Sequence, residues 1–554
     1  RYAGFLGLRI GLWHGDIGEP ARRRMLRDPP EILLTTPESL EAMMISARLD
    51  HAAFLGNLRA AIVDELHAFA GDDRGWHLLF LLARIEQLAG SRIQRIGLTA
   101  SVGNPGELIG WFSAGRGGRV VGPTEPVTNG QVTADHVGSV RNAITVISRL
   151  HRGERRLVFA DSRSRVEEVA TGLREAEAAF AAESDCVIVA TSTLELGLDV
   201  GDLDRVVQVG APPSVASFLQ RMGRTGRRAG TARNCLLLAT DDEELLICLA
   251  LASLWREGKV EPVVAPPRPA HIFAQQIMAL ALQLSGVARP EVKLWLGEAM
   301  EAVSHEDRDT VLGHMLAGGI LAEDDGVLGL GAQGEREFGR RHFADLVAAF
   351  TEPLQLAVRC GPIDVGAVHP ASLAPSSRSW AAVLSLGGRS WKVVDVDWRK
   401  RTVDVVSATS AGRSRWLGSA RNVAAATCRA AERIVAGAEP SCRLSRRAES
   451  ALAEIRSRLP FVDAVRLPVV SDGAGRGTVW TFGGGAAASS VAAELAASDL
   501  GVIGSDDFSV SVRGATVGEV ADRVRCIDPD LAHPRLPDDL LSALKFGLCL
   551  PEQL

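Results

Sequence analysis

Several common features are absent from this 554-residue sequence, and each absence excludes a class of protein. No run approaches the roughly 20 apolar residues that span a bilayer, and no charged-then-apolar leader opens the chain. The eight cysteines include no Cys-x-x-Cys pair and have no histidines at metal-ligand spacing, which argues against a structural zinc or iron–sulfur site. We therefore predict a cytoplasmic protein without membrane contact, whose thiols are reduced and buried.

A strongly basic composition is also absent, because the net charge is −6. Whole-chain charge does not describe local patches, however, and arginines cluster at residues 22–27 and 221–233. Apolar residues make up 46% of the chain and charged residues 23%, as in water-soluble globular proteins. Because 554 residues exceed one ordinary hydrophobic core, we expect three or four domains.

A short apolar stretch that ends in two acidic residues organises the first part of the chain. Residues 58–67 read LRAAIVDELH, so a strand-like run stops at Asp64 and Glu65. Ligands of an open α/β sheet lie beyond the carboxyl ends of its parallel strands. Asp64 could hold Mg²⁺ through its water shell, Glu65 could activate a water, and His67 could relay the state of the site. The alternative is a strand end with a solvated acidic turn.

Other short patterns stand before and after DELH in a fixed order. They are TTPESL (35–40), GLTASVGN (97–104), LVFADSR (157–163), TSTLELGLD (191–199) and QRMGRTGR (220–227). Together with DELH they resemble motifs Ib, II, III, IV, V and VI of superfamily 2 helicases, in the correct order.

The TTPESL pattern supports two interpretations that can hold together. Hydroxyls and backbone N–H groups at a helix start can bind a nucleic-acid phosphate. Thr36 can equally be the N-cap of a helix with Pro37 in its first position. We favour phosphate contact, because the resemblance extends to the neighbouring residues 14–16, which read His-Gly-Asp.

The QRMGRTGR pattern predicts a functional helix face. A helix that starts near residues 212–214 would place Gln220, Arg224 and Arg227 on one face, at i, i+4 and i+7. An amide and two guanidiniums at a lobe boundary are the groups that the opposite lobe needs to stabilise the transition state of the γ-phosphate. The alternative is a solvated basic helix.

Over essentially its whole length the chain resembles the Lhr (large helicase-related) family of superfamily 2 DEAD/DEAH-box helicases. Further matching segments are residues 74–77, 230–240, 335–350, 388–399 and 481–483. The resemblance implies an α/β multidomain fold with two RecA-like lobes, a winged helix and a β-barrel-containing α+β module. It also implies a monomeric motor that uses Mg²⁺ and ATP to move 3′ to 5′ on single-stranded DNA. Unwinding of DNA or RNA–DNA duplexes and a role in DNA repair follow from the same resemblance.

The alternation of strand and helix patterns places the domain boundaries. We expect the first lobe at residues 1–125 with motifs Ib, II and III, and the second at 126–260 with motifs IV, V and VI. Residues 261–360 are mainly helical, which suits a winged helix. Residues 361–554 contain the β-rich module.

The resemblance also assigns roles to single residues. Asp64 would hold Mg²⁺ through water, Glu65 would activate the attacking water, and His67 would link hydrolysis to motion. Thr99 and Ser101 would couple the lobes. The chain has Thr-Ala-Ser where the family has Ser-Ala-Thr, and both spellings keep a hydroxyl at each position.

Further assigned residues would bind the nucleotide and the nucleic acid. The nucleotide-binding set is Gly197, Asp199, Gln220, Arg224 and Arg227, with Arg227 as the arginine finger. The set that contacts the nucleic-acid backbone is Thr35, Thr36, Arg163 and Thr191.

Two departures from the family pattern define the alternatives. No Gly-x₄-Gly-Lys-[Ser/Thr] phosphate cradle occurs, and the family places it before residue 1. Thr191 lies 32 positions after Phe159, where a further strand and helix are expected, so residues 173–174 resemble a deletion point. We therefore expect a truncated or defective helicase. The alternatives are a nucleic-acid-binding scaffold without ATPase activity and a Ski2-like RNA helicase, since the choice of DNA or RNA depends on 2′-OH contacts.

Overall fold

The computed structural model describes most of the chain up to residue 525. The described residues are 5–15, 17–47, 49–122, 130–178, 187–191, 203–226, 233–339, 356–361, 363–368, 373, 383–386, 389–397, 402–408, 423–460, 468–471, 476–497, 501–514 and 516–525. Among them, no helix is both long enough and apolar enough to cross a membrane.

The N-terminal part contains two separate pairs of parallel strands with helices packed on one side. The strands are β1 (Ile10–Trp13) with β2 (Ile32–Thr35), and β3 (Ala60–Val63) with β4 (Gln94–Gly97). The helices are α2 (Glu19–Arg27), α3 (Pro37–Met44), α4 (His51–Leu55), α5 (Leu66–Ala70), α6 (Asp73–Ala89) and α7 (Pro105–Phe112). Alternate strand residues on the other side are exposed, among them Leu12, Leu34 and Ile62. Helices therefore cover one face of these strands and leave an apolar face open.

A six-stranded parallel sheet forms the second α/β part. Its strand order is β18-β5-β9-β8-β6-β7. The strands are β5 (Gln131–His136), β6 (Arg156–Ala160), β7 (Val187–Ala190), β8 (Arg205–Val209), β9 (Asn234–Ala239) and β18 (Arg443–Leu444). The helices are α8 (Val140–Arg149), α9 (Arg163–Ala178), α10 (Val215–Met222) and α11 (Asp242–Arg256). Strand β6, which pairs with β8 on one side and β7 on the other, is buried along its whole length, as expected for a parallel strand covered on both faces.

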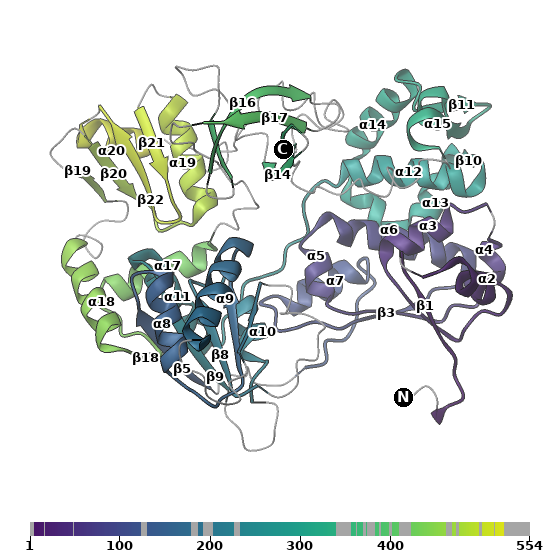
Figure 1. Ribbon diagram of the computed structural model, residues 1–554. Coiled ribbons are helices and arrows are strands. Elements are labelled where there is room, and N and C mark those ends of the chain that lie inside the picture. The colour runs from purple at the N-terminus through teal and green to yellow at the C-terminus, as the bar shows by residue number, and fades with distance from the viewer. Residues whose placement is uncertain are drawn as a thin grey trace.

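The next segment adds a small antiparallel sheet and a nearly all-apolar helix. The sheet has the order β10-β12-β11. The elements are α12 (Ala270–Leu284), β10 (Val287–Ala288), α13 (Val292–Leu296), α14 (His305–Ala317), β11 (Leu321–Asp324), β12 (Val327–Leu330) and α15 (Ala332–Phe338). Helix α12 is apolar on almost every side and is buried, because it packs against α6 in one continuous hydrophobic cluster. Figure 1 shows these teal helices lying against the purple N-terminal part.

The C-terminal part contributes two further sheets and two helices that pack against the second lobe. The sheets have the orders β14-β13-β17-β16-β15 and β19-β20-β22-β21. Their strands are β13 (Leu356–Cys360), β14 (Ile363–Val368), β15 (Val383–Leu386), β16 (Arg389–Asp397), β17 (Thr402–Ser407), β19 (Val469–Ser471), β20 (Arg476–Trp480), β21 (Gly501–Ser505) and β22 (Ser509–Arg513). The helices are α17 (Ala425–Val435), α18 (Arg446–Arg458), α19 (Gly485–Ala497) and α20 (Val517–Arg525). Helices α17 and α18 share a hydrophobic cluster with α11, and they lie beside the blue second lobe (Figure 1).

The α/β multidomain class expected from the sequence is confirmed, and both α/β parts have the parallel strands expected of RecA-like lobes. One helix, α9, joins the neighbouring strands β6 and β7, and β7 ends the described strand order. The deletion near residues 173–174 stays a prediction, as do the bounds of the four domains.

Candidate functional site: a cleft between two lobes

The two acids of DELH lie directly after a strand, as the sequence predicted. Strand β3 ends at Val63, and Glu65 takes a left-handed backbone conformation at φ 50° before α5 begins. A left-handed non-glycine residue is uncommon and typical of functional turns. Asp64 is exposed, and its Oδ1 accepts a hydrogen bond from the Glu65 N–H at 3.0 Å. The turn therefore presents a carboxylate to solvent at the carboxyl end of the strand.

The loop after β4 is tied to the same turn. Leu98 N donates to Val63 O at 2.8 Å, and Leu66 N donates to Leu98 O at 2.8 Å. These bonds bring Thr99 next to the acidic turn. DELH and GLTASVGN are therefore one structural unit.

His67 connects this unit to the second lobe. Its Nδ1 lies 3.0 Å from Thr99 Oγ1, and the Thr99 hydroxyl donates onward to Ala100 O. Its Nε2 lies 2.7 Å from Gln220 Nε2, which belongs to α10. Because the Gln220 amide donates and the Thr99 hydroxyl accepts, His67 carries its proton on Nδ1. One imidazole thus bridges motifs II, III and VI.

The protonation of His67 is set by its partial burial at the contact between the two lobes. Burial lowers the pKa of His67 below its ordinary value, and the Glu65 and Asp64 carboxylates oppose that shift. The neutral form is therefore the one that accepts from Gln220. Glu65 Oε2 lies 3.6 Å from Nδ1, so it can stabilise the charged form when the histidine is protonated.

Helix α10 ends earlier than the sequence suggested. Its last residue is Met222, Gly223 is its C-cap, and Thr225 N bonds to Met222 O in a tight turn. The prediction that Gln220, Arg224 and Arg227 share one helical face is therefore wrong. Arg224 lies beyond the helix and is 9% exposed, and Arg227 lies outside the described residues.

Arg221 was missed as a structural residue of this site. It is 2% exposed, its Nη1 donates to Asp161 Oδ1 at 3.0 Å and to Gln208, and its guanidinium lies over the Phe159 ring at 5.0 Å. These contacts fix α10 on the sheet at the end of β6. The spacing of Arg221 could have predicted its burial, because Phe218, Arg221 and Met222 share the buried face of the helix.

The segment between the second lobe and α12 also belongs to the site. Here we call residues 260–266 the strap. The Glu261 carboxylate accepts from Val215 N at 2.8 Å and from Ala216 N at 3.2 Å, at the start of α10. Glu261 O accepts from Gly103 N at 3.1 Å, and Asn104 bonds to both backbone groups of Val263 at 2.8 and 3.0 Å. The strap therefore joins motif III to the motif VI helix. The prolines of the strap did not predict this role.

The remaining predicted residues are spread along the lobes. Thr36 accepts from Ser39 N at 3.2 Å, which confirms its role as the N-cap of α3. Thr35, Thr36, Thr99 and Ser101 are exposed, Thr191 is half-buried after β7, and Arg163 begins α9. Gly197 and Asp199 lie outside the described residues.

Within the described residues no group of three or more histidine, cysteine, aspartate or glutamate side chains could hold a metal. A phosphate-bound Mg²⁺ ion needs less, because it keeps several waters and takes one or two carboxylates. The exposed Asp64 at the end of β3 fits that requirement.

Comparison with known proteins finds similarity to helicases. The DEAD/DEAH box helicase family matches residues 1–108, and the helicase conserved C-terminal domain matches residues 139–229. The Lhr helicase/probable uracil glycosylase of Mycolicibacterium smegmatis is 30% identical over 338 residues. The ATP-dependent helicase Lhr-Core protein 2 of Thermococcus barophilus is 30% identical over 321 residues. The chain is similar to the Lhr helicases.

The similarities cover only part of the relatives' own length. Each of the two relatives matches 50% of the chain, which covers 22% of the first and 36% of the second. The structure of Mycobacterium smegmatis helicase Lhr bound to ssDNA and AMP-PNP has a TM-score of 0.70 to this chain at 22% identity. That likeness covers 95% of this chain and 74% of the other, so the fold is shared over nearly all of this chain.

Proposed function

We propose that this chain is the body of an Lhr-family nucleic-acid motor that couples Mg-ATP hydrolysis to 3′-to-5′ movement on single-stranded DNA. The motor unwinds DNA or RNA–DNA duplexes, acts as a monomer in the cytoplasm, and serves DNA repair. The observation that carries the proposal is the His67 bridge, which links Thr99 in one lobe to Gln220 in the other. A motor needs such a link between its hydrolytic turn and the facing lobe.

Each lobe has a separate role in the proposal. Asp64 holds Mg²⁺ through water, and Glu65 orients or deprotonates the attacking water. Bound Mg²⁺ neutralises phosphate charge. Gly197, Asp199, Gln220, Arg224 and Arg227 complete the nucleotide site from the second lobe, with Arg227 as arginine finger.

In the proposal, the nucleic acid contacts residues at helix starts and strand ends in both lobes. Thr35 and Thr36 are exposed at the start of α3, where backbone N–H groups favour phosphate. Arg163 and Thr191 supply the contacts of the second lobe. The complex of the Mycobacterium smegmatis relative with ssDNA and AMP-PNP supports this assignment of ligands.

A second function is favoured by a specific observation. No Gly-x₄-Gly-Lys-[Ser/Thr] segment occurs in these 554 residues, so the usual anchor for the ATP phosphates is lacking here. These residues alone would then act as a nucleic-acid-binding scaffold. A Ski2-like RNA helicase stays open as a third function, because the described contacts do not distinguish 2′-OH groups.

ATP hydrolysis with and without single-stranded DNA tests the proposal, on this chain and on a version extended upstream. We expect background turnover from the chain itself and DNA-stimulated turnover from the extended version. In the extended version, Glu65→Gln should abolish stimulation and leave DNA binding nearly intact, because it removes the water-activating carboxylate. Unchanged turnover in Glu65→Gln would remove Glu65 from its role. DNA-stimulated turnover by the unextended chain would contradict the scaffold alternative.

A further inference from the structure

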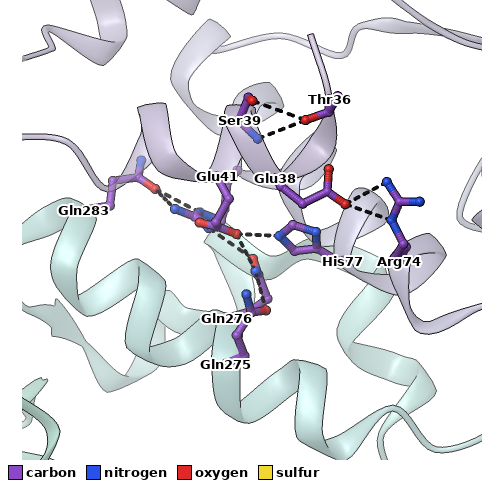
Figure 2. Close-up of polar contacts among 10 residues, drawn as sticks. Thr36, Glu38, Ser39, Glu41, Arg74, His77, Gln275, Gln276 and Gln283 are labelled. Atoms are coloured by element: carbon purple, nitrogen blue, oxygen red, sulfur yellow. Dashed lines mark hydrogen bonds and ion pairs between the residues drawn. The ribbon is translucent and has the colours of Figure 1, made fainter. Parts of the chain in front are cut away.

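The strap carries the chain from the second lobe onto the first. It follows α11, which packs in the core of the second lobe, and it leads into α12, which packs in the core of the first. Arg84 of α6 donates to Gln276 of α12 at 3.1 Å, within a network of buried side chains that Figure 2 shows. Asp73 of α6 pairs with His271 of α12 at 2.8 Å. The downstream end of the strap therefore belongs to the first lobe.

Asn104, at the end of motif III, holds the middle of the strap. Its Oδ1 accepts from Val263 N at 2.8 Å, and its Nδ2 donates to Val263 O at 3.0 Å and to Glu107 Oε2 at 2.8 Å. Asn104 is the N-cap residue of α7, a position where an asparagine side chain usually bonds to a first-turn N–H group. Here the side chain makes no such bond. Its amide pairs instead with both backbone groups of one strap residue.

The strap in turn holds the start of α10. Glu261 accepts from Val215 N at 2.8 Å and from Ala216 N at 3.2 Å. These N–H groups have no partner within the helix, whereas the next one, of Ser217, bonds to Ser214 Oγ. Loss of Glu261 would leave two donors without their acceptor beside the buried Val215 side chain, which is costly. We call this contact between the strap and the start of α10 the pivot.

The two ends of α10 are held with different strength. Hydrogen bonds to a carboxylate, as at the pivot, are roughly twice as strong as a neutral bond such as that between Gln220 and His67. Gln220 lies about 8 Å along the helix axis from Val215. The helix moves with the second lobe, because Arg221 fixes it on the sheet. Separation of the lobes therefore breaks the Gln220 contact first and turns the second lobe about the pivot.

We propose that Asn104 is a positioning residue for the nucleotide site: it holds the strap on motif III, so that the second lobe closes on the acidic turn by rotating about the pivot. The inference rests on the proposed function, because it takes the two lobes as the two sides of a nucleotide site. Asn104 acts through Val263 and Glu261.

Loss of the pivot makes the closed arrangement rarer without changing the groups that carry out hydrolysis. When a ligand binds an arrangement that is only partly populated, its apparent affinity falls by that population. Saturating ligand restores the closed arrangement. A chain without a firm pivot should therefore need more ATP and still reach nearly the normal maximum rate.

The test is steady-state ATP hydrolysis by the upstream-extended chain at saturating single-stranded DNA. Asn104→Ala should raise the KM for ATP about tenfold and leave kcat within about twofold of wild type. A residue that only supported folding would lower kcat through a smaller active fraction and leave KM unchanged. Asn142→Ala is the matched control, because Asn142 also bonds to a backbone carbonyl, Val137 O at 2.7 Å, and should change neither constant.

A second variant removes the same contact from the side of the strap. Val263→Pro deletes the N–H that bonds to Asn104 and leaves motif III unaltered. The strap already contains proline at residues 262 and 266. We expect a rise in KM of similar size, and the combined variant should match Asn104→Ala alone. Rises in KM that multiply in the combined variant would overturn the inference.

Hydrogen exchange tests the pivot without a measurement of activity. In the wild-type chain the Val215 and Ala216 amides should be equally protected without nucleotide and with AMP-PNP, because their acceptor stays in place when the lobes open. In Asn104→Ala both amides should exchange about fivefold faster. Protection that depends on AMP-PNP, or exchange in Asn104→Ala that equals wild type, would overturn the inference.

The outcomes separate this inference from the proposed function. DNA-stimulated hydrolysis with an unchanged KM in Asn104→Ala would overturn the inference and leave the proposed function standing. Absence of DNA-stimulated hydrolysis in the wild-type extended chain would contradict the proposed function instead. In that case the exchange of Val215 and Ala216 decides whether the pivot exists.

Discussion

At the scale of residues, the cleft depends on one neutral imidazole. His67 accepts from Gln220 of the second lobe through Nε2 and faces Thr99 of its own lobe through Nδ1, so both of its ring nitrogens have a partner. Protonation would put a hydrogen on Nε2 and remove its acceptor role. The contact between the lobes is therefore sensitive to pH.

The first prediction concerns this pH dependence. Because the folded-state pKa of His67 is lowered, the neutral form is favoured in the closed cleft. The stabilisation that the His67–Gln220 contact gives to the folded state is fully present above the ordinary histidine pKa of about 6.5. It is lost as the pH falls through the lowered pKa of His67. In the upstream-extended chain, DNA-stimulated turnover should decline on the acid side with an apparent pKa below about 6.5.

A matched variant identifies the group responsible for that decline. Gln220→Ala removes the donor that needs neutral His67. Turnover of this variant should be lower overall, and the acid limb of its pH profile should be shallower. An acid limb that is the same in Gln220→Ala would assign the titration to another group.

At the scale of elements, the strap is the part of the site with the sharpest steric requirement. A Cβ on Gly103 would lie 2.2 Å from Val260 O, closer than any packed side chain allows. Gly103→Ala should therefore push the strap away from motif III and lower Tm by a few degrees, at a cost on the order of 1–3 kcal/mol. Gly106→Ala is the control, because nothing lies within 4 Å of its Cβ and alanine favours α7. Equal Tm values for the two variants would contradict the role of the strap.

Glu261 gives a second prediction for the same element. Its carboxylate accepts from two N–H groups at the start of α10, where a negative charge is also favoured by the helix dipole. Glu261→Gln should loosen the start of α10, with faster hydrogen exchange at Val215 and Ala216 and lower DNA-stimulated turnover in the extended chain. Glu257→Gln, in the exposed segment before the strap, should change neither. Unaltered exchange at both amides would show that the carboxylate does not hold the helix.

Local patterns predicted many of these elements from the sequence. The strand-like run that stops at Asp64 matches β3, and the Thr-Pro pair at residues 36–37 marks the start of α3 because its capping chemistry is local. The end of α10 was missed because helical spacing was extended through Gly223, which is its C-cap. The prolines at residues 212–213 precede the N-cap Ser214 instead of occupying the first turn.

Long-range polar contacts could not be predicted in the same way. Trp76 donates to Pro266 O at 2.7 Å and Arg84 reaches Gln283, although these partners are 190 and 199 positions apart. Neither pair has a local periodicity. A partial signal existed in α12, where Gln275, Gln276 and Gln283 interrupt an otherwise apolar helix and therefore need buried partners.

At the scale of the whole molecule, each lobe shares its hydrophobic core with a distant part of the described chain. One hydrophobic cluster unites the first lobe with α12 and the elements after it, and another unites the second lobe with α17 and α18. Strand β18 extends the second-lobe sheet, and Arg447 beside it bonds to Asp135 of β5 at 2.5 Å. Closure of the cleft would thus move each lobe together with its attached region, which is how a small change at the nucleotide could shift a bound strand.

The most direct test is a double-mutant cycle on His67 and Gln220 in the upstream-extended chain, measured as DNA-stimulated ATP turnover. If the two side chains act as one link between the lobes, His67→Ala and Gln220→Ala should each lower turnover, and the double variant should lose little more than either single variant. Multiplicative losses, as expected for independent residues, would contradict the account.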